Sequence, residues 1–499
     1  MIESFDHRPG REVDVAIIVE GCYPHVSGGV STWIDWLLRN STDHSFAVTS
    51  IVAPLGERRS RYDFPENLVR FEELVLGKGA PKPFLDWRRR NFDANDVAMR
   101  LVSFLTNGTL RDLENLEAVV NDTARPLPFN TLMRGRCGWE LCAATYRELM
   151  PHASFRDYFW AYQALVGGLF AVMKARVPKA KVCHTISTGY AGLMAARARI
   201  AGFPSVILTE HGVYTNERRI EILMSEWIAS NVDRGLADDK SRNDLRDFWI
   251  MAFESYARAC YEASSSITTL FGDNQSMQRL LGAPENRLQV IANGIDVERF
   301  SAIPQPPNDA PLTVALIGRV VPIKDIKTFL GAARRIANAM QGVRILIAGS
   351  MDEDPGYAAE CLAMCSSFGL NGIVEFLGQV DVRKLIAQTH VVVLTSLSEA
   401  QPLTVLEAGA AKRPCVTTDV GACREMIEVP GEEGGFVADL LDADQVGDAV
   451  VRLLKDEALR RTFGENLSRR VERLYTSEIS ASHYHALYNI APIVESQVA

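Results

Sequence analysis

Two glutamates in the C-terminal half have a spacing that could serve a polar ligand. Glu399 follows an apolar run, and Glu407 lies about one and a half turns into a helix that begins near Pro402. The N–H groups of Leu403 and Thr404 would then face a ligand with the positive helix end behind them, which suits a diphosphate. Both carboxylates could accept hydrogen bonds from sugar hydroxyls. Two acids alone, however, are better explained as one capping and one solvated side chain.

Two cations precede these acids and strengthen the interpretation. Arg319 and Lys324 lie five positions apart in the loop after the apolar run 312–317. Both side chains could converge on one diphosphate leaving group, whose developing charge must be neutralised when a sugar is transferred from a nucleotide. Either cation alone would more simply be a solvated surface residue. Together with the two glutamates, they indicate an anion site.

Glycines and histidines are the candidate functional residues of the N-terminal half. His211 stands at the carboxyl end of an apolar run, although a lone histidine is more often structural than catalytic. Gly28 and Gly29 precede a predicted helix and would let the backbone approach a ligand closely, although a turn explains them equally well. His184 also ends an apolar run. The sequence leaves open whether His184 faces an acceptor or caps the chain locally.

Short apolar runs alternate with stretches of helical periodicity and must position these residues. The predicted strands are 13–20, 46–52, 68–76, 181–186 and 206–209, then 312–317, 343–348, 373–377, 391–395 and 415–418. The predicted helices are 30–38, 325–340, 356–368, 403–411 and 443–455. This rhythm is typical of parallel sheets covered on both faces. We predict an α/β protein with two Rossmann-like, doubly wound domains that face each other across a cleft.

A domain boundary is expected near residues 301–311, where four prolines in eleven residues prevent a helix or central strand. The N-terminal domain would span residues 1–303 and the C-terminal domain residues 304–475. Residues 81–151 break the strand–helix rhythm and are interpreted as a helical insertion into the first domain. Residues 476–499 are expected to form a C-terminal helix.

Composition excludes several classes of protein. The chain has 499 residues, with 53 lysines and arginines against 62 aspartates and glutamates, and this net charge of −9 argues against nucleic-acid binding. Neither a Gly-x-Gly-x-x-Gly fingerprint nor a P-loop motif is present, which disfavours a dinucleotide redox cofactor and a P-loop nucleotidase. The densest apolar stretch, Tyr162–Met173, is too short to span a membrane, and no signal peptide is visible.

Metal binding is not expected either. The nine cysteines are scattered without a Cys-x-x-Cys pair, which favours buried free thiols in a reducing cytosol. The strings Asp352-Glu-Asp354 and Asp442-Ala-Asp444 match the Asp-x-Asp pattern of metal-dependent transferases. Such strings are common by chance in acidic loops, so we interpret them as loops.

Taken together, these residues resemble family 4 of the retaining glycosyltransferases, which have the GT-B fold. The general resemblance covers about residues 13–475 and rests on Gly28-Gly29, Glu210-His211-Gly212, Gly318-Arg319, Lys324, Ser396-x-x-Glu399 and Glu407-Ala408. A narrower resemblance, to the Pel exopolysaccharide glycosyltransferases (PelF type), rests on Glu20–Trp33, His184–Gly192 and Ser398–Leu403. Two sites depart from the general pattern. The family often has Gly where this chain has Asp325, and Gly-Phe-Gly where it has Ala400-Gln401-Pro402.

The resemblance implies a hexosyltransferase that uses UDP-glucose or a UDP-N-acetylhexosamine, retains the anomeric configuration and needs no metal or other cofactor. The implied catalytic residues are His211, near the reacting carbon, with Arg319, Lys324 and Glu399. The implied donor-binding residues are Gly28, Gly29, Gly318, Arg319, Lys324, Gln379, Val380, Leu403, Thr404 and Glu407. Glu399 would bind hexose hydroxyls and Glu407 the ribose, while Gln379 and Val380 would face the base. The last helix would cross back to the first domain, as in other GT-B proteins.

The Pel resemblance implies a polysaccharide acceptor, a cytoplasmic location and recruitment to the inner membrane face by a membrane-bound biofilm exopolysaccharide complex. Two alternatives remain open from the sequence. The first is another family 4 activity, in disaccharide or lipid-linked glycan synthesis. The second is a non-catalytic sugar-nucleotide sensor. A basic or apolar patch would favour a lipid acceptor. Trp87–Arg90 is the only hint of one, and a solvated loop explains it better.

Overall fold

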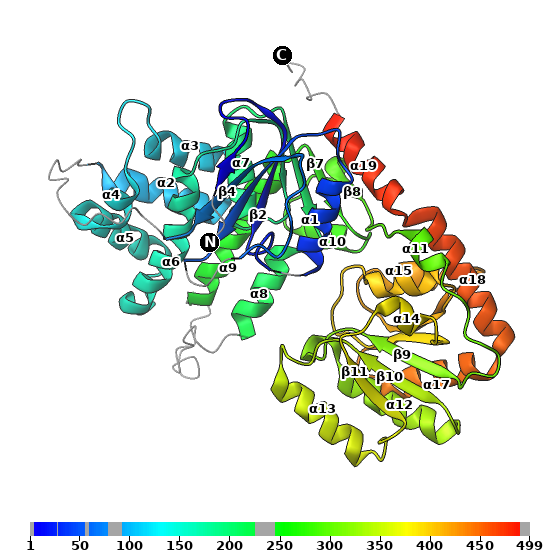
Figure 1. Ribbon diagram of the computed structural model, residues 1–499. Coiled ribbons are helices and arrows are strands. Elements are labelled where there is room, and N and C mark those ends of the chain that lie inside the picture. Colours follow the sequence, from blue (N-terminus) through cyan, green and yellow to red (C-terminus); the bar gives the residue numbers. More distant parts are fainter. Residues whose placement is uncertain (1–3, 27, 55–58, 78–91, 225–244, 490–499) are drawn as a thin grey trace. The chain divides into compact units, whose positions relative to one another are not determined.

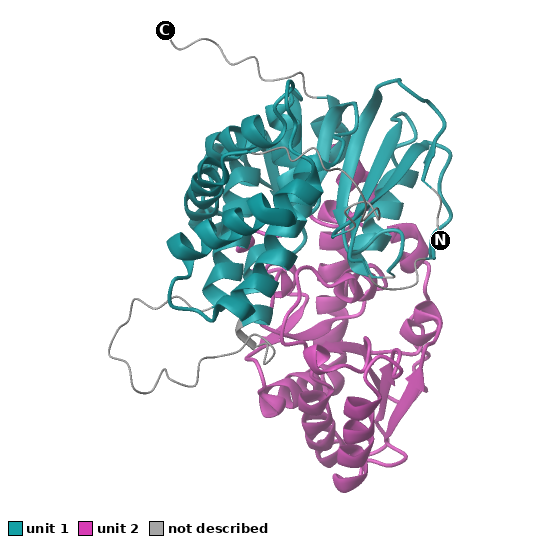
Figure 2. Cartoon of the chain, turned by 90° about the vertical axis from the view of Figure 1, so that its left-hand side faces the viewer, with its two compact units in different colours: residues 1–269, 275–289, 484–499 teal, residues 270–274, 290–483 magenta. Residues whose placement is uncertain are grey.

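The computed structural model describes residues 4–26, 28–54, 59–77, 92–224 and 245–489 (Figure 1). Trp87–Arg90 therefore lies outside the described residues. The chain divides into two compact units, shown in different colours in Figure 2. Unit 1 comprises residues 1–269, 275–289 and 484–499, and unit 2 comprises residues 270–274 and 290–483. The division falls before the boundary expected after residue 303, because Ile295 and Phe300 are buried in the core of unit 2.

Unit 1 is built on an eight-stranded sheet in the order β1-β4-β3-β2-β5-β6-β7-β8. Its strands are β1 (Phe5–Asp6), β2 (Val13–Glu20), β3 (Phe46–Val52), β4 (Leu68–Val75), β5 (Ala180–Thr185), β6 (Ser205–Glu210), β7 (Ser266–Thr269) and β8 (Leu288–Val290). The pairs from β4 to β7 are parallel, and β1 joins β4 antiparallel. The order β4-β3-β2-β5-β6-β7 is that of a doubly wound fold, with its switch point between β2 and β5.

Some helices of unit 1 lie beside this sheet, and others form a separate helical layer. The helices beside the sheet are α1 (Gly29–Arg39), α7 (Tyr190–Ile200), α8 (Tyr214–Met224), α9 (Leu245–Ala263) and α10 (Asn274–Leu280). The layer contains α2 (Ala94–Asn107), α3 (Leu110–Val120), α4 (Phe129–Met133), α5 (Gly135–Leu149) and α6 (Phe155–Lys174), and Figure 1 shows α2 to α5 gathered at one edge of the unit. The expected insertion, residues 81–151, is helical over most of its described part. The apolar stretch Tyr162–Met173 contains most of the buried residues of α6.

The last helix, α19 (Ser477–Asn489), contributes its final turns to unit 1. Tyr484 packs edge-on against Trp33 with ring centroids 5.2 Å apart, and Tyr488 packs against Phe46 at 6.1 Å. Both tyrosines are buried. Tyr484 and Tyr488 are thus part of the core of unit 1.

Unit 2 holds a six-stranded, fully parallel sheet in the order β11-β10-β9-β12-β13-β14. Its strands are β9 (Thr313–Ile317), β10 (Arg344–Ala348), β11 (Val374–Gly378), β12 (Val391–Leu394), β13 (Cys415–Thr418) and β14 (Gly435–Ala438). Its helices are α11 (Val297–Ser301), α12 (Ile326–Ala339), α13 (Pro355–Ser367), α14 (Val382–Ile386), α15 (Leu403–Ala410), α16 (Cys423–Ile427), α17 (Ala443–Lys455) and α18 (Glu457–Leu474). The switch point lies between β9 and β12, and the prediction of two Rossmann-like domains is confirmed.

Two further findings bear on the sequence-based expectations. Within the described ranges, no helix is both long enough and apolar enough to cross a membrane. All nine cysteines are free thiols, and only Cys22 and Cys137 are not fully buried. The expectation of buried free thiols is therefore confirmed for the other seven.

Candidate functional site

The switch point of unit 2 brings together two of the predicted residues. Lys324 closes a short 3-10 turn in the loop after β9, and Glu399 lies in the loop after β12. The Nζ of Lys324 donates to Oε1 of Glu399, and the two side chains are only 21% and 14% exposed. The Ser396 hydroxyl donates to the same oxygen at 2.7 Å. Ligands of doubly wound sheets bind at this point, beyond the carboxyl ends of the strands.

The backbone after Lys324 explains the first departure from the family pattern. Asp325 has a φ of 44°, in the left-handed region that glycine adopts freely and that aspartate tolerates better than most residues. Its Oδ1 accepts a hydrogen bond from the N–H of Thr328 at 3.2 Å, so Asp325 also caps α12. Thr395 fixes the loop from the other side, because its hydroxyl donates to the Asp325 carbonyl at 2.9 Å.

Arg319 and Lys324 bind different carboxylates in this structure. Arg319 Nη1 donates to Oε2 of Glu353 at 2.6 Å, and both side chains are about half exposed, at 55% and 49%. The two cations were expected to converge on one anion. In the structure each cation is instead paired with its own acid, and a diphosphate would have to replace or share those partners.

Two glycines that the sequence analysis did not single out support these loops. A Cβ on Gly349 would lie 2.0 Å from the carbonyl oxygen of Gly318. A Cβ on Gly421 would lie 2.3 Å from the carbonyl oxygen of Glu399 and 2.2 Å from that of Ala400. Only glycine permits such approaches, so Gly349 and Gly421 hold the site loops in place. By contrast, the nearest atoms to a Cβ on Gly318 would be Cδ, Cε and Cγ of Lys324, at ordinary distances of 3.6, 3.7 and 3.8 Å.

The N-terminus of α15 lies directly after the loop of Glu399. Leu403 is exposed, and Thr404 is half-buried with its hydroxyl 3.5 Å from the carbonyl of Ile317. No side chain caps this helix end. Glu407 lies one turn further on. Burial raises the pKa of its carboxyl to about 7, and Arg299 opposes that shift.

Gln379 and Val380 directly follow the carboxyl end of β11, and both are exposed. They thus lie at the same edge of the sheet as Lys324 and Glu399. The predicted unit 2 residues are therefore gathered at one edge of the sheet.

Gly28 and Gly29 lie at the start of α1 in unit 1, and no described residue crowds either of them. Gly28 has an extended backbone with a φ of 178°, which any residue can adopt. A Cβ at either position would have no heavy atom within 4 Å among the described residues. The space beside both glycines is thus unfilled by the described chain.

His211 directly follows β6 and packs edge-on against Trp33 of α1, with ring centroids 4.6 Å apart. Both ring nitrogens are buried and have no hydrogen-bond partner among the described residues. Burial lowers the pKa of His211 to about 4, so the ring is neutral at pH 7. Such a group is prepared to hydrogen-bond a ligand, since unsatisfied buried polar atoms are rare and costly.

Glu210 is the neighbour of His211 and is fixed by three side chains. Its Oε2 accepts hydrogen bonds from the Tyr261 hydroxyl at 2.8 Å and the Gln278 amide at 2.9 Å, and its Oε1 accepts from Thr188 at 3.4 Å. Burial raises the pKa of the Glu210 carboxyl to about 7, against these hydrogen bonds. Sequence reasoning included Glu210 in a motif but gave it no role, because its partners lie far away in the chain.

His184 is fully buried, and neither alternative left open by the sequence holds. Its Nδ1 lies 2.8 Å from the Tyr488 hydroxyl and its Nε2 lies 2.8 Å from the Thr209 hydroxyl. Burial, with His211 nearby, lowers the pKa of His184 to about 3. His184 is thus a structural residue that ties α19 to the sheet.

Among the described residues, no three or more His, Cys, Asp or Glu side chains form a group that could hold a metal ion. The Asp-x-Asp strings have local structural uses instead. Asp354 accepts from the N–H of Tyr357 at 2.9 Å, and Asp442 accepts from the N–H of Gln445 at 2.8 Å, so each caps a helix.

Two doubly wound units with residues of this kind at their carboxyl edges define a GT-B protein, and the solved structures agree. A sucrose-phosphate synthase from Thermosynechococcus elongatus is 17% identical, with a TM-score of 0.57 over 96% of this chain and 98% of that one. Anabaena Alr3699/HepE in complex with UDP is 13% identical, with a TM-score of 0.57 over 95% of this chain and 100% of that one.

The chain belongs to the family described as a domain of unknown function (DUF3492), whose model matches residues 13–286, more than half of the chain. Residues 311–456 match the model described as glycosyl transferases group 1, so the C-terminal half is of the group 1 type.

Curated relatives point in the same direction. N-acetyl-alpha-D-glucosaminyl L-malate synthase of Bacillus anthracis is 24% identical over 51% of this chain and 64% of the relative. N,N'-diacetylbacillosaminyl-diphospho-undecaprenol alpha-1,3-N-acetylgalactosaminyltransferase of Campylobacter jejuni is 28% identical over 43% of this chain and 58% of the relative. The chain thus matches about six tenths of the length of these two relatives.

Proposed function

We propose that the protein is a retaining glycosyltransferase that transfers a hexose from a UDP-sugar to a growing exopolysaccharide of the Pel type. The observation that carries this proposal is the Lys324–Glu399 pair at the switch point of unit 2, next to the uncapped N-terminus of α15. The two curated relatives are named as an N-acetyl-alpha-D-glucosaminyl L-malate synthase and an N-acetylgalactosaminyltransferase, and Anabaena Alr3699/HepE has been solved with UDP and with UDP-glucose. UDP-glucose and UDP-N-acetylhexosamines are the proposed donors.

In this proposal, unit 2 binds the donor. Arg319 and Lys324 bind the diphosphate, together with the N–H groups of Leu403 and Thr404 at the helix end. Glu399, released from Lys324 when the diphosphate binds, accepts hydrogen bonds from hexose hydroxyls. Glu407 accepts from the ribose. Gly318 leaves room beside Lys324, and Gln379 and Val380 face the base through backbone atoms.

Unit 1 supplies the acceptor side and His211. The neutral imidazole of His211 offers one donor and one acceptor nitrogen, neither of which is used by the described protein. It hydrogen-bonds the hexose near the reacting carbon. The described chain leaves a Cβ at Gly28 or Gly29 without a neighbour within 4 Å, so a ligand could approach the backbone closely there.

The proposed reaction is substitution on one face of the sugar. The acceptor hydroxyl forms the new glycosidic bond while the bond to UDP breaks, and the acceptor proton leaves with the diphosphate. Arg319, Lys324 and the positive end of α15 stabilise the developing charge, so the residues themselves supply what a metal ion supplies in other transferases. We propose that activity needs no added metal or cofactor.

The acceptor and the cellular setting rest on the resemblance to Pel transferases. We propose a polysaccharide acceptor, action on the cytoplasmic side of the membrane and recruitment by a membrane-bound synthesis complex. The test is co-purification of the tagged chain with such a complex from cell membranes, compared with a Lys324→Ala chain that should still be recruited. A chain found only in the soluble fraction, with full polymer synthesis, would refute recruitment.

Isothermal titration of the full-length protein with UDP, ADP, GDP, UDP-glucose and UDP-N-acetylgalactosamine, all with EDTA, tests the donor assignment. We expect binding of the uridine compounds alone, and the tighter of the two UDP-sugars identifies the donor. If none of them binds, the donor site is wrongly assigned. If a UDP-sugar binds but is neither hydrolysed nor transferred to any acceptor, the chain is a sensor and the proposed enzyme activity is refuted.

A further inference from the structure

Unit 2 contains a cavity of about 560 Å³ at the amino edge of its sheet, opposite the edge of Lys324 and Glu399. Leu312, His390 and Pro414, which line the cavity, directly precede β9, β12 and β13. Small-molecule sites have volumes of roughly 300–1,000 Å³, so this cavity could take a metabolite. It is separate from the residues assigned to the donor.

The charge of the cavity is positive, although the whole chain is negative. Its cations are Lys412, Lys455, Arg460 and Arg461, and its only acids are Glu457 and Glu465. Arg461 binds Glu457 at 2.6 Å. Lys412 and Lys455 have no ion-pair partner among the residues that the structure describes. Two ammonium groups are therefore available to an anion.

His390 adds a neutral donor to this lining. Its Nδ1 accepts a hydrogen bond from the backbone N–H of Thr313 at 3.1 Å, so the proton of the neutral ring resides on Nε2. No described residue accepts from that nitrogen. Burial, with Arg460 and Arg413 nearby, lowers the pKa of His390 to about 4, which keeps the ring neutral at pH 7.

The rest of the lining is apolar. Pro306, Pro307, Leu312, Pro414 and Leu454 contribute carbon surface beside the cations. An anion with a carbon skeleton would therefore fit this cavity better than a bare ion. Phosphate esters of sugars and nucleosides have this combination of charge and skeleton.

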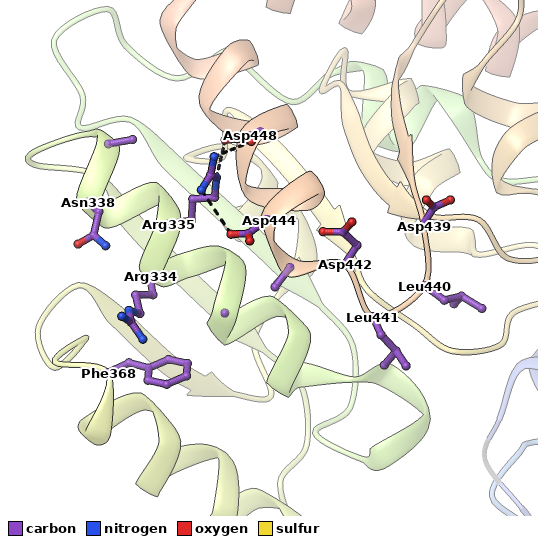
Figure 3. Close-up of a pocket in the computed structure, with 13 residues that line it drawn as sticks. Arg334, Arg335, Asn338, Phe368, Asp439, Leu440, Leu441, Asp442, Asp444 and Asp448 are labelled. Atoms are coloured by element: carbon purple, nitrogen blue, oxygen red, sulfur yellow. Dashed lines mark hydrogen bonds and ion pairs between the residues drawn. The ribbon is translucent and has the colours of Figure 1, made fainter.

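A second cavity of unit 2, of about 890 Å³, lacks an excess of cations (Figure 3). Its acids outnumber its cations, and Figure 3 shows Arg335 bound to Asp444 and Asp448. Its other cation, Arg334, lies over the ring of Phe368 at 5.2 Å. Arg334 therefore provides a matched control on the same unit.

We propose that the amino-edge cavity binds a small phosphate ester, with Lys412 and Lys455 contacting the phosphate and His390 Nε2 donating to the same ligand. Such a ligand would occupy unit 2 together with the donor. The proposal is independent of the donor assignment, because the two sets of residues lie at opposite edges of the sheet.

Calorimetry on the full-length protein saturated with UDP tests this proposal. The probes are inorganic phosphate, glucose 6-phosphate and UMP, which separate recognition of bare phosphate from recognition of a phosphate ester. We expect at least one ester to bind more tightly than inorganic phosphate. In the Lys412→Ala/Lys455→Ala variant its affinity should fall by about tenfold or more, whereas Arg334→Ala should leave it unchanged.

Three results would overturn the proposal: no probe binds, inorganic phosphate binds as tightly as the esters, or the double variant binds as well as the original protein. Competition of the ester with UDP would also overturn it, because the probe would then occupy the donor site. If UDP itself does not bind, the donor assignment fails, and the same titrations without UDP still decide on the cavity. Thermal unfolding of each variant verifies that it folds.

Discussion

Substituting Lys324 should weaken the binding of UDP, whereas substituting Glu399 should not. The two side chains are 21% and 14% exposed and bind each other without a ligand. In Lys324→Ala the diphosphate loses one charge-assisted contact. Such a contact contributes about 1.5–3 kcal/mol, which corresponds to roughly a 10- to 150-fold weaker affinity for UDP and for the UDP-sugar alike.

Glu399→Gln keeps the shape of the side chain but removes its charge. Lys324 then no longer has to leave a carboxylate in order to bind the diphosphate, so the affinity for UDP should stay the same or increase. The UDP-sugar loses a charged acceptor for its hydroxyls, so its preference over UDP should fall by about tenfold or more. The hydroxyl of Ser396, 2.7 Å from Oε1, remains available to orient the glutamine.

Isothermal titration with UDP and the UDP-sugar on both variants measures these effects, and Lys327→Ala is the matched control. Lys327 is three residues from Lys324 and forms an exposed ion pair with Glu360 at 2.6 Å, so its removal should leave both affinities unchanged. Equal losses of UDP affinity in Lys324→Ala and Glu399→Gln would refute the reasoning. They would show that the intact pair, and not the free ammonium, supports the site.

Three other substitutions test other parts of the structure. Gly421→Ala should displace the loop of Glu399 and weaken UDP-sugar binding more than UDP binding by calorimetry, because the added Cβ would lie 2.3 Å from the Glu399 carbonyl; unchanged binding would contradict this. Gly28→Ala should lower the thermal unfolding midpoint by only a few degrees, because its Cβ would meet no described heavy atom within 4 Å and alanine is merely a poorer N-cap than glycine, while transfer activity falls; unchanged transfer activity would contradict the assignment. Arg413→Met should cost about 3 kcal/mol or more in urea unfolding, because its buried guanidinium donates to the carbonyls of Pro304, Ile386 and Ala411; a loss under 1 kcal/mol would be inconsistent with these bonds.

The pH dependence of stability follows from the buried histidines. The pKa of His184 is about 3 in the folded chain, against an ordinary value of 6.5, so the unfolded chain takes up a proton first as the pH falls. Stability should therefore decrease from about pH 6.5 towards pH 3. His184→Gln, which can still bond Tyr488 and Thr209, should make this decrease shallower in urea unfolding at pH 7 and pH 5. An unchanged slope would mean that His184 is not buried in its neutral form.

Most strands could be predicted from the sequence because parallel strands buried on both faces are continuous apolar runs. β9 (Thr-Val-Ala-Leu-Ile) and β12 (Val-Val-Val-Leu) follow this rule most closely. β7 (Ser266–Thr269) does not, because it is Ser-Ile-Thr-Thr, and its hydroxyls are satisfied by contacts such as Thr268 with Thr209 at 2.7 Å. Such a polar buried strand can be recognised only when the neighbouring strand that satisfies its hydroxyls is known.

The positions of the candidate residues could also be predicted, but not their partners. Strand order places Lys324 and Glu399 at one edge, since β9 and β12 are neighbours. Glu353 lies 34 residues from Arg319 and was interpreted as part of an acidic loop, yet it pairs with that arginine. Gly349 and Gly421 were missed because each is required by a backbone segment from another loop, which no local pattern reveals.

The two departures from the family pattern change local supports more than they change donor chemistry. Asp325 adopts the left-handed backbone that a glycine would adopt at the same place, and its side chain turns to cap α12. Gln401 is buried, and its side-chain oxygen accepts from the N–H of Asn293 at 2.6 Å. Neither side chain competes with Lys324 or Glu399. Selection of the sugar should therefore depend on Glu399 and the loop that carries it, so the Glu399→Gln titration tests whether this carboxylate recognises the sugar.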